Sequence, residues 1–455
     1  MRVAKAVPFV LAVLLVFTAA AFLLLLPRRT LVSGEGGLET AVFARDGDVR
    51  EGRNRGDYLT VKIAVMGPGD ELYFWWGHIA LVIDDAVTGE SRFYDYGLFS
   101  FEADSFFSNF ALGRLIYSCG ASAAERNYRA YRNNNRDITV YTLDLDPNVR
   151  EEVRRFAETN ILPENKYYYY HHFKDNCATR IRDIIDLAVG GQFKAAFKEA
   201  PGRYTLRQHV RRHTWFSPFW DWLLNFLMGQ DIDVPLTVWQ EMFLPKEIGN
   251  RALDFKYTDA AGAERTLVNS VEVLNRAVNR PQVLDAPRRQ WPREFVAGLV
   301  IAAVIRLLRL FKRRKTVPGR ILTGVVHALL GFFFGAVGLV LFFMTFFTNH
   351  DYTYHNFNIL FVNPLLLAAV PLGIMVAAGK GRKTGFLSPG SLLKTLWTYV
   401  FFGGLFTLII RILPQFYQQN QVTLAMMFPF ALALSFIPSW IKRFFNRNRI
   451  TAVIL

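Results

Sequence analysis

The stretch FKDNCATRIRD, residues 173–183, decides the fold of the first half of the chain, because it joins a polar turn to an amphipathic segment. Asn176 is a good helix N-cap, and the apolar residues after it recur at helical spacing. Cys177 therefore falls in the first turn of an expected helix, where unpaired backbone N–H groups and the positive dipole end favour a thiolate and can stabilise an oxyanion. We predict that Cys177 is a nucleophile and that Asn176 contacts substrate. The alternatives are a buried structural cysteine and a disulfide with Cys119.

A cysteine nucleophile needs a base, and His78 is the best candidate because it opens a hydrophobic strand beside the core. Asp95, on the next expected strand, is placed to orient the imidazole. Two later histidines are alternative bases: His171 and His172. Two tyrosines are alternatives to Asp95, and the second is also a candidate substrate contact: Tyr94 and Tyr96.

Two arginines follow the cysteine within one helical turn and a half, Arg180 and Arg182. Guanidinium groups bind phosphate well, so these side chains are candidates to hold the phosphate of a lipid substrate. The competing interpretation is an ion pair with Asp183, and we expect structural pairing to be the main role.

Composition and charge indicate a membrane protein of two structural units. The chain has 455 residues, which exceeds one typical domain. A hydrophobic content of 52% and a mean hydropathy of +0.17 indicate membrane segments. The net charge of +15 is concentrated in four basic stretches, each beside an apolar run: 2–5, 312–320, 380–383 and 442–449. This distribution follows the positive-inside rule and argues against a nucleic-acid partner.

The apolar runs predict a membrane anchor and a helical membrane domain. Residues 6–27 are long enough to span a bilayer, and we expect an uncleaved signal anchor over residues 1–29. A cleavable signal peptide is the alternative, and either segment would export the region C-terminal to it. Five further spans are expected within residues 295–455: 295–311, 321–348, 359–378, 392–413 and 421–441. With the N-terminus inside, the basic loops face the cytoplasm.

Residues 30–294 have mixed polarity and are expected to form one exported domain. Strand and helix patterns are mixed without regular βαβ alternation, which indicates an α+β fold. The expected strands are 58–66, 78–84, 92–96 and 138–145, and the expected helices are 147–160 and the segment that begins at Cys177. The second and third strands are expected to form a hairpin. An aromatic-rich segment, residues 215–243, is expected either at a membrane interface or in a buried core.

The loop between the second and third C-terminal spans, residues 349–358, is polar and aromatic and is expected on the exported side. His350, His355 and Asn356 are candidates to bind substrate, either by lining an active-site floor or by contacting a lipid headgroup. The alternative is an ordinary solvated turn. No metal site is expected, because only Asp351 accompanies the two histidines.

The order of the proposed catalytic residues is informative. Papain-like enzymes place the cysteine before the histidine, whereas here the histidine strand precedes the cysteine helix. This order resembles the circularly permuted NlpC-type group, which includes lecithin:retinol acyltransferase-like enzymes. The resemblance implies an α+β papain-like domain whose cysteine takes an acyl chain from a phospholipid as a thioester.

A closer resemblance covers most of the chain, to the Lnb N-terminal periplasmic domain family and its membrane half. Seven ordered motifs carry it: PGDELYFWWGHIALVI, YDYGLFSF, ALGRLIYS, FKDNCATRIRDIID, YTLRQHV, EMFLPKE and HDYTYHNFNILFVNPL. His78 and Cys177 match the family's His and Cys motifs. The resemblance implies a lipoprotein N-acyltransferase that moves an acyl chain from phospholipid to the N-terminal amine of a diacylated lipoprotein, without a cofactor. It further implies a multi-pass protein of the bacterial inner membrane with residues 30–294 in the periplasm.

Three rival functions remain open at this point. A cell-wall amidase or cysteine peptidase uses the same pair of residues on a peptide bond, but it has no need of five C-terminal spans. A phospholipase is the same enzyme with water as acceptor. A membrane-tethered binding or assembly factor with an inert Cys177 is the non-enzymatic alternative.

Overall fold

The computed structural model describes residues 54–99, 106–313, 316–380 and 387–435. The expected N-terminal anchor, residues 1–29, lies outside these ranges. The described residues form two compact units: a sheet unit, residues 54–216 and 234–287, and a helical unit, residues 217–233 and 288–435. The chain therefore has the two structural units that its length and apolar runs indicate.

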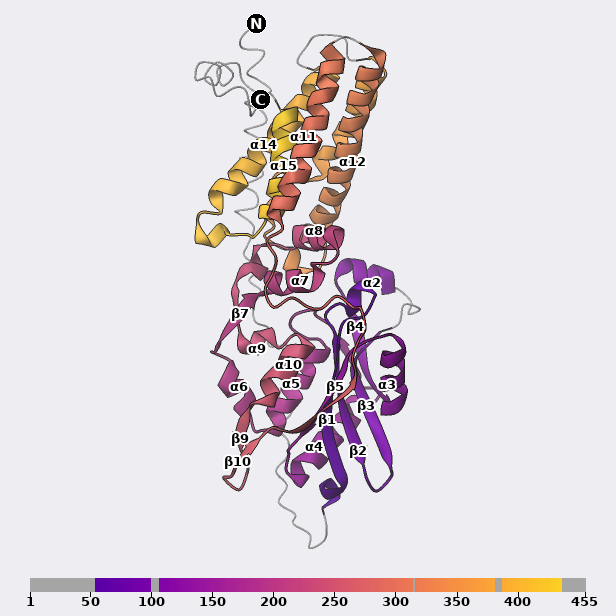
Figure 1. Cartoon of the computed structure of the whole chain (residues 1–455), viewed down its shortest axis with the longest axis vertical. Helices are drawn as coiled ribbons and strands as arrows, with labels where there is room; N and C mark the ends of the chain where they lie inside the picture. Colours follow the sequence, from indigo (N-terminus) through magenta and orange to yellow (C-terminus); the bar gives the residue numbers. More distant parts are fainter. Residues whose placement is uncertain (1–53, 100–105, 314–315, 381–386, 436–455) are drawn as a thin grey trace. The chain divides into compact units, whose positions relative to one another are not determined.

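A seven-stranded antiparallel sheet organises the sheet unit (Figure 1), in the order β11-β5-β1-β2-β3-β4-β6. Its strands are β1 (Leu59–Met66), β2 (His78–Asp85), β3 (Glu90–Leu98), β4 (Ile116–Ala123), β5 (Ile138–Leu143), β6 (Tyr167–Tyr169) and β11 (Val268–Asn275). The expected hairpin is confirmed: β2 and β3 pair antiparallel across a turn at Gly89, whose φ is +71°. The other expected strands are confirmed as β1 and β5.

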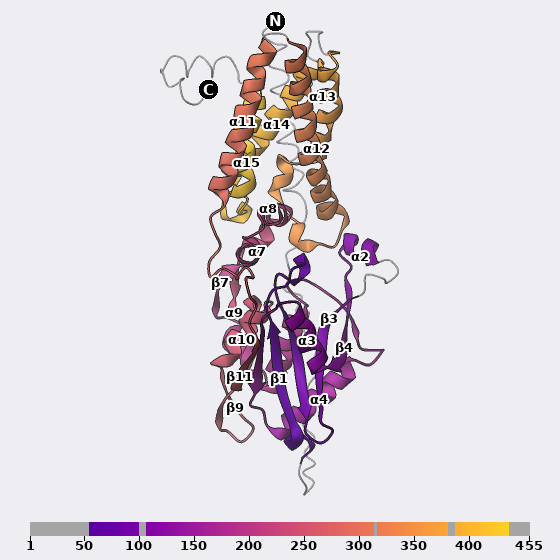
Figure 2. The same cartoon turned by 45° about the vertical axis from the view of Figure 1, so that its right-hand side comes forward.

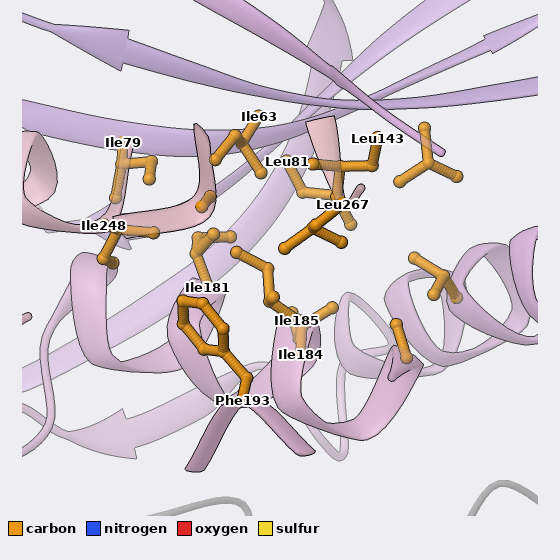
Figure 3. Close-up of a cluster of buried hydrophobic side chains, with 14 of the residues drawn as sticks. Ile63, Ile79, Leu81, Leu143, Ile181, Ile184, Ile185, Phe193, Ile248 and Leu267 are labelled. Atoms are coloured by element: carbon orange, nitrogen blue, oxygen red, sulfur yellow. The ribbon is translucent and has the colours of Figure 1, made fainter. Parts of the chain in front are cut away.

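Side chains of alternate residues build two cores, one on each face of the sheet. Ile63 and Leu81 face the helix α5 (Cys177–Ala188), whose apolar stripe includes Ile181. Figure 3 shows this core. Ala64, Val82 and the other residues of opposite parity face α3 (Ala124–Asn133). Figure 1 shows α5 and α3 on opposite sides of the sheet, and Figure 2 shows α3 in front of the strands.

The remaining elements of the sheet unit are short and follow the sheet in the sequence or connect its strands. The helices are α2 (Phe106–Leu112), α4 (Pro147–Asn160), α6 (Gln192–Phe197), α7 (Leu206–Thr214), α9 (Val238–Glu241) and α10 (Pro245–Leu253). Two small sheets pair β7 (Pro201–Thr205) with β8 (Pro235–Thr237), and β9 (Lys256–Thr258) with β10 (Glu264–Thr266). Helix α4 has the bounds expected from its periodicity.

The helical unit contains α8 (Pro218–Leu227), α11 (Trp291–Arg313), α12 (Val317–Phe347), α13 (Ala369–Ala377), α14 (Pro389–Ile410) and α15 (Gln421–Leu434). Among the described residues, three helical stretches are long and apolar enough to cross a membrane: Val317–Phe347, Phe357–Ala377 and Pro389–Ile410. Helix α15 is apolar but shorter. Helix α11, at the first expected span, is not among the three, and its sequence is interrupted by Arg306 and Arg309.

The aromatic segment 215–243 divides between the two units. Trp222 and Phe226 of α8 are buried in the core of the helical unit, where the indole of Trp222 stacks on Phe333 at 5.7 Å between ring centroids. Phe243 instead belongs to the sheet unit, where its ring contacts Phe173. The division differs from the single exported domain expected over residues 30–294. Its physical reason is that the apolar face of α8 is covered by membrane-helix side chains.

Candidate active site

Cys177 is the first residue of α5, and its neighbours fix the start of that helix. The Asn176 side chain accepts hydrogen bonds from the backbone amides of Ala178 at 2.8 Å and Thr179 at 3.0 Å, and the Thr179 hydroxyl accepts from the Asn176 amide at 2.8 Å. This reciprocal capping box satisfies the backbone amides of Asn176, Ala178 and Thr179. Two of the amides that we expected to be available to an oxyanion are therefore occupied by Asn176. The Cys177 amide has no partner among the described residues and is the remaining donor at the helix start.

The amide nitrogen of the Asn176 side chain also fixes the residues that precede Cys177. Its Nδ2 donates to the carbonyl oxygens of His172 at 2.8 Å and Phe243 at 3.1 Å. Asn176 is only 5% exposed. All its hydrogen-bonding capacity in this arrangement goes to the protein, so its geometry is that of a residue that positions Cys177.

His78 and Asp95 form a buried pair on neighbouring strands. His78 is the first residue of β2, directly after Gly77, whose φ of +81° lets the chain turn sharply into the strand. The Nε2 atom of His78 lies 2.9 Å from Oδ1 of Asp95. The same carboxylate oxygen accepts the backbone amide of Gly97 at 2.8 Å. The residue proposed to orient the imidazole thus contacts it directly.

The imidazole of His78 is poised to carry a proton. Burial opposes its charged form, but the charge of Asp95 and the neighbouring Tyr131 and Cys177 outweigh burial and raise the pKa of His78 well above its ordinary value. The pKa of Asp95 is shifted the opposite way. Burial disfavours its carboxylate, but His78, the Gly97 amide and Arg136 hold the pKa of Asp95 below its ordinary value. The charge of Cys177 is thus one of the influences that raise the pKa of His78.

The two tyrosines beside Asp95 point to the opposite face of β3. Tyr94 and Tyr96 lie in the same core as Ile181 and are 1% and 0% exposed. The Tyr94 hydroxyl donates to Glu158, and the Tyr96 hydroxyl is buried without a partner among the described residues. Their positions do not bring either hydroxyl to the His78–Asp95 pair, because alternate residues of a strand face opposite sides.

The two alternative bases belong to the turn before the cysteine. The Nδ1 atom of His171 accepts the amides of Phe173 and Lys174, both at 3.1 Å. The ring of His172 lies edge-on to Tyr170 at 5.4 Å between centroids. His171 thus shapes the turn with one ring nitrogen, whereas His78 has a carboxylate partner and a charge interaction with Cys177.

Arg180 and Arg182 are occupied by carboxylates of their own segment. Arg180 makes a two-point pair with Asp175, through Nε at 2.8 Å and Nη2 at 2.9 Å, and its guanidinium lies 3.7 Å from the centre of the Tyr168 ring. Arg182 pairs with Asp183 at 2.8 Å and donates to the carbonyl oxygen of Trp239 at 3.0 Å. Arg182 thus makes the ion pair expected with Asp183, whereas Arg180 pairs with Asp175 instead. The proposed contact of both arginines with phosphate stays a prediction.

The three substrate-binding candidates in the loop 349–358 are engaged inside the helical unit. His350 Nδ1 lies 2.8 Å from the Tyr352 hydroxyl, and His355 Nδ1 lies 2.7 Å from Oδ2 of Asp231. Asn356 is 0% exposed and donates from Nδ2 to the carbonyl oxygen of Phe226 at 2.8 Å. These contacts hold the loop to α8 and to the residues that follow it.

Several residues around His78 carry no sequence signal of their own. Tyr131 of α3 stacks on the His78 ring at 6.3 Å between centroids with an interplanar angle of 24°. A Cβ atom built on Gly97 would lie 2.9 Å from Cε1 of His78. The glycine in the YDYGLFSF motif was the only hint of this close approach. Tyr131 lies 53 positions after His78 and is brought to it only by the fold.

The cysteines and possible metal ligands complete the description of the site. Cys119 and Cys177 are both free thiols, and Sγ of Cys119 donates to the carbonyl oxygen of Asn160 at 2.8 Å. The described ranges contain no group of three or more His, Cys, Asp or Glu side chains arranged to hold a metal ion.

Comparison with known proteins agrees with the resemblance seen in the sequence motifs. A family model described as the Lnb N-terminal periplasmic domain matches residues 49–212, and one described as the Lnb transmembrane domain matches residues 290–443. Neither the search of curated proteins nor the search of solved structures gave a match. The first model contains all three residues of the His78–Asp95–Cys177 set, and the second contains the three long apolar stretches.

Proposed function

The chain belongs to the Lnb family through both of its halves, and from this premise we propose that it is a membrane-bound, cysteine-dependent lipoprotein N-acyltransferase. It would take an acyl chain from a phospholipid, carry it as a thioester on Cys177 and pass it to the N-terminal amine of a diacylated lipoprotein. The observation that carries the proposal is the buried His78–Asp95 pair, whose imidazole has a charge interaction with Cys177 at a helix start.

The hydrogen bond to Asp95 assigns separate roles to the two nitrogens of His78. An ionised carboxylate can only accept hydrogen bonds. Nε2 of His78 therefore carries the ring hydrogen and donates a hydrogen bond to Asp95. The lone pair is then on Nδ1, which is the atom that accepts the thiol proton of Cys177. This is the logic of a nucleophile, a base and an orienting group. The raised pKa of His78 makes its imidazole a stronger proton acceptor.

The first half-reaction forms the thioester. The Cys177 sulfur attacks the ester carbonyl of the phospholipid, and the backbone amide of Cys177 is the donor available to the resulting oxyanion. The tetrahedral intermediate then collapses: the ester C–O bond breaks, and the departing lysophospholipid oxygen takes the proton from His78. Cys177 keeps the acyl chain, and His78 returns to its neutral form.

The second half-reaction regenerates the thiol. The neutral α-amine of the lipoprotein attacks the thioester carbonyl, and His78 removes a proton from the nitrogen as the C–N bond forms. The C–S bond breaks, the amide product leaves, and the proton on His78 returns to the sulfur. Water competes with the amine for the same thioester, so a phospholipase differs from a transferase only in its acceptor.

The architecture supports this assignment in two further ways. The histidine strand β2 precedes the cysteine helix α5 across an antiparallel sheet, which is the order expected of a permuted papain-like, NlpC-type domain. The apolar stretches of the helical unit anchor the protein in a membrane. We propose that this membrane is the bacterial inner membrane, crossed several times, with the sheet unit in the periplasm. Both proposed substrates have their reacting groups at the surface of such a bilayer.

Intact-mass measurement of the full chain tests the proposal directly. The protein in detergent micelles is incubated with phosphatidylethanolamine vesicles, beside Cys177→Ala and the matched control Cys119→Ala. We expect an added acyl mass on the native chain and on Cys119→Ala, and none on Cys177→Ala. A synthetic diacylated lipopeptide added afterwards is expected to remove the adduct and gain the same mass on its amine.

Other outcomes separate the rivals. Release of free fatty acid without transfer to the peptide would establish a phospholipase. The absence of an adduct in reductant, in a protein that remains folded, would contradict a thioester mechanism and favour a binding or assembly factor.

A further inference from the structure

Arg136 is a buried cation close to the candidate active site. It lies in the turn between α3 and β5 and is 2% exposed. Its Nε donates to the carbonyl oxygen of Gly67 at 2.9 Å. Its guanidinium carbon lies over two aromatic rings, 4.6 Å from the centre of Phe74 and 4.8 Å from the centre of Tyr131. The side chain is therefore held by a hydrogen bond and by contact with two aromatic rings.

Among the residues that the structure describes, no carboxylate contacts the guanidinium. Its Nη2 is buried and has no hydrogen-bond partner within the described ranges. The nearby Asp70 pairs instead with Arg280, at 2.8 Å. Burial lowers the pKa of Arg136, as expected for a cation removed from water without a counter-ion at contact distance. A buried charge without a counter-charge destabilises the fold, so we expect groups of negative charge near Arg136.

Some of the charges that act on Arg136 belong to the site; Glu71 and Arg280, outside it, also act on the guanidinium, the first favouring and the second opposing its charge. Its positive charge helps to lower the pKa of Asp95, and Cys177 and Tyr131 act on Arg136 in return. Tyr131 connects the two groups physically, because one of its faces carries the guanidinium and the ring also stacks on the imidazole of His78. Phe74, Arg136, Tyr131 and His78 thus form one continuous series of stacked groups.

Counting charges shows what this arrangement does. Asp95 contributes one negative charge and Arg136 one positive charge. The His78–Cys177 pair has no net charge, either as imidazole with thiol or as imidazolium with thiolate. When an oxyanion replaces the thiolate, the set remains neutral. Without Arg136 the set would carry one net negative charge in every state, and any negative charge forming at Cys177 would be repelled by Asp95.

We propose that Arg136 is a positioning residue of the thiol site, whose charge offsets Asp95 and stabilises the negative charge that forms at Cys177, while its stack on Tyr131 holds the ring against His78. This inference rests on the proposed function only in taking Cys177 as the nucleophile. It explains why a cation is buried here with no carboxylate of the described residues in contact, and it assigns a role to two residues that have no motif.

Alkylation of Cys177 tests the proposal without requiring any acyl transfer. The full chain in detergent, in a Cys119→Ala background, is treated with iodoacetamide between pH 5 and 9, and the rate is followed by intact mass. The titratable or charged groups that face Cys177 or Arg136 from the surrounding elements are His78, Tyr117, Tyr131, Tyr168, Tyr170, Glu71 and Arg280. They are the same in all variants, so differences between variants report on Arg136.

We expect Arg136→Met to shift the midpoint of the alkylation rate upward by about one pH unit and to slow alkylation at pH 6 by about tenfold. Arg136→Lys retains the charge and is expected to restore most of the shift. The matched control is Arg150→Met, which also removes an arginine bonded to backbone carbonyls, those of Leu145 and Leu59. It is expected to leave the profile unchanged.

An unchanged midpoint in a folded Arg136→Met protein would overturn the proposal and leave Arg136 as a structural residue only. If Arg136→Met fails to fold, Arg136→Lys is the variant that tests the proposal. A midpoint displaced by a full pH unit despite the retained charge overturns the electrostatic role of Arg136. A midpoint near the native value supports that role. A shifted profile in a protein that transfers no acyl chain would uphold the role of Arg136 and contradict the proposed function.

Discussion

Oδ1 of Asp95 lies 2.9 Å from Nε2 of His78, and the same oxygen accepts the Gly97 amide at 2.8 Å. The carboxylate is therefore fixed by the backbone of its own strand and in turn fixes the ring on the neighbouring strand. This double contact determines which ring nitrogen faces away from Asp95. The pairing of the two strands thereby fixes which nitrogen of His78 carries the hydrogen in the neutral ring.

Asp95→Asn is expected to reduce the rate of acylation of Cys177 by about 10³–10⁴-fold, because an amide NH₂ can donate to Nε2 and move the proton to Nδ1. The substitution also removes a charge that raises the pKa of His78, so the acid limb of the pH–rate profile is expected to move to lower pH. The measurement is single-turnover acylation as a function of pH. Asp84→Asn is the matched control, since Asp84 pairs with Lys62 and Ser91 at the other end of the hairpin. Equal rates in the two variants would contradict the orienting role of Asp95.

Gly97→Ala is expected to lower the acylation rate by about 10–100-fold without unfolding the protein, because the new Cβ would lie 2.9 Å from Cε1 of His78 and 3.4 Å from Oδ1 of Asp95. Displacing the imidazole by a fraction of an ångström disturbs its alignment with the thiol. Gly120→Ala is the control, because among the described residues its Cβ would meet only the end of the flexible Leu98 side chain. Rates and circular dichroism of both variants check the prediction. A native rate in Gly97→Ala would show that the ring has room to move.

Each of the three residues proposed to carry the chemistry has a local signal in the sequence, and their catalytic roles stay predictions. Cys177 follows a helix cap, His78 opens an apolar strand, and Asp95 lies on the hairpin partner of that strand. Arg136 and Tyr131 have no such signal, because only the packing of α3 on the sheet brings them to the histidine. Their roles depend on contacts between residues more than 50 positions apart.

The polar loop 349–358 has a clear sequence signal whose meaning depends on what surrounds it in the fold. Histidines and asparagines in a loop indicate ligand binding, but the same residue types also satisfy buried backbone carbonyls. Nothing in the sequence distinguishes a solvated amide from Asn356, which is fully buried against Phe226. The sequence likewise predicted one exported domain, because the apolar face of α8 alone does not reveal which core covers it.

His213 is expected to make the protein less stable in acid. Burial lowers its pKa to about 3, so the folded protein keeps this ring neutral while the unfolded chain takes up a proton near the ordinary pKa of about 6.5. Between those two pH values the unfolded state binds the extra proton, and the contribution to the free energy of unfolding is lost as the pH falls, by about 1.4 kcal/mol per unit. Above pH 6.5 the contribution is fully present.

His213→Gln removes this titration, so its thermal stability is expected to fall less than that of the native chain between pH 6.5 and 4. His172→Gln, in the turn before the cysteine, serves as the control for loss of an imidazole. Thermal unfolding followed by circular dichroism across this pH range is the measurement. Parallel decreases in the native chain and in His213→Gln would be inconsistent with a buried neutral histidine.

Asn356→Ala is expected to destabilise the helical unit without a specific effect on substrate binding. The Asn356 side chain donates from Nδ2 to Phe226, and its Oδ1 accepts the Asn358 amide and Nε2 of Gln418, both at 3.0 Å. Removing it leaves three buried polar groups with a lost partner, and we expect a decrease of about 2–3 kcal/mol in the free energy of unfolding. Asn349→Ala, at an exposed position of the same loop, is the control. Thermal unfolding in detergent and the dependence of acylation rate on phospholipid concentration together decide the matter. A headgroup-binding role would raise the phospholipid concentration at half-maximal rate in a protein of native stability. The contacts in the structure instead predict lower stability, with an unchanged half-maximal concentration in the fraction that remains folded.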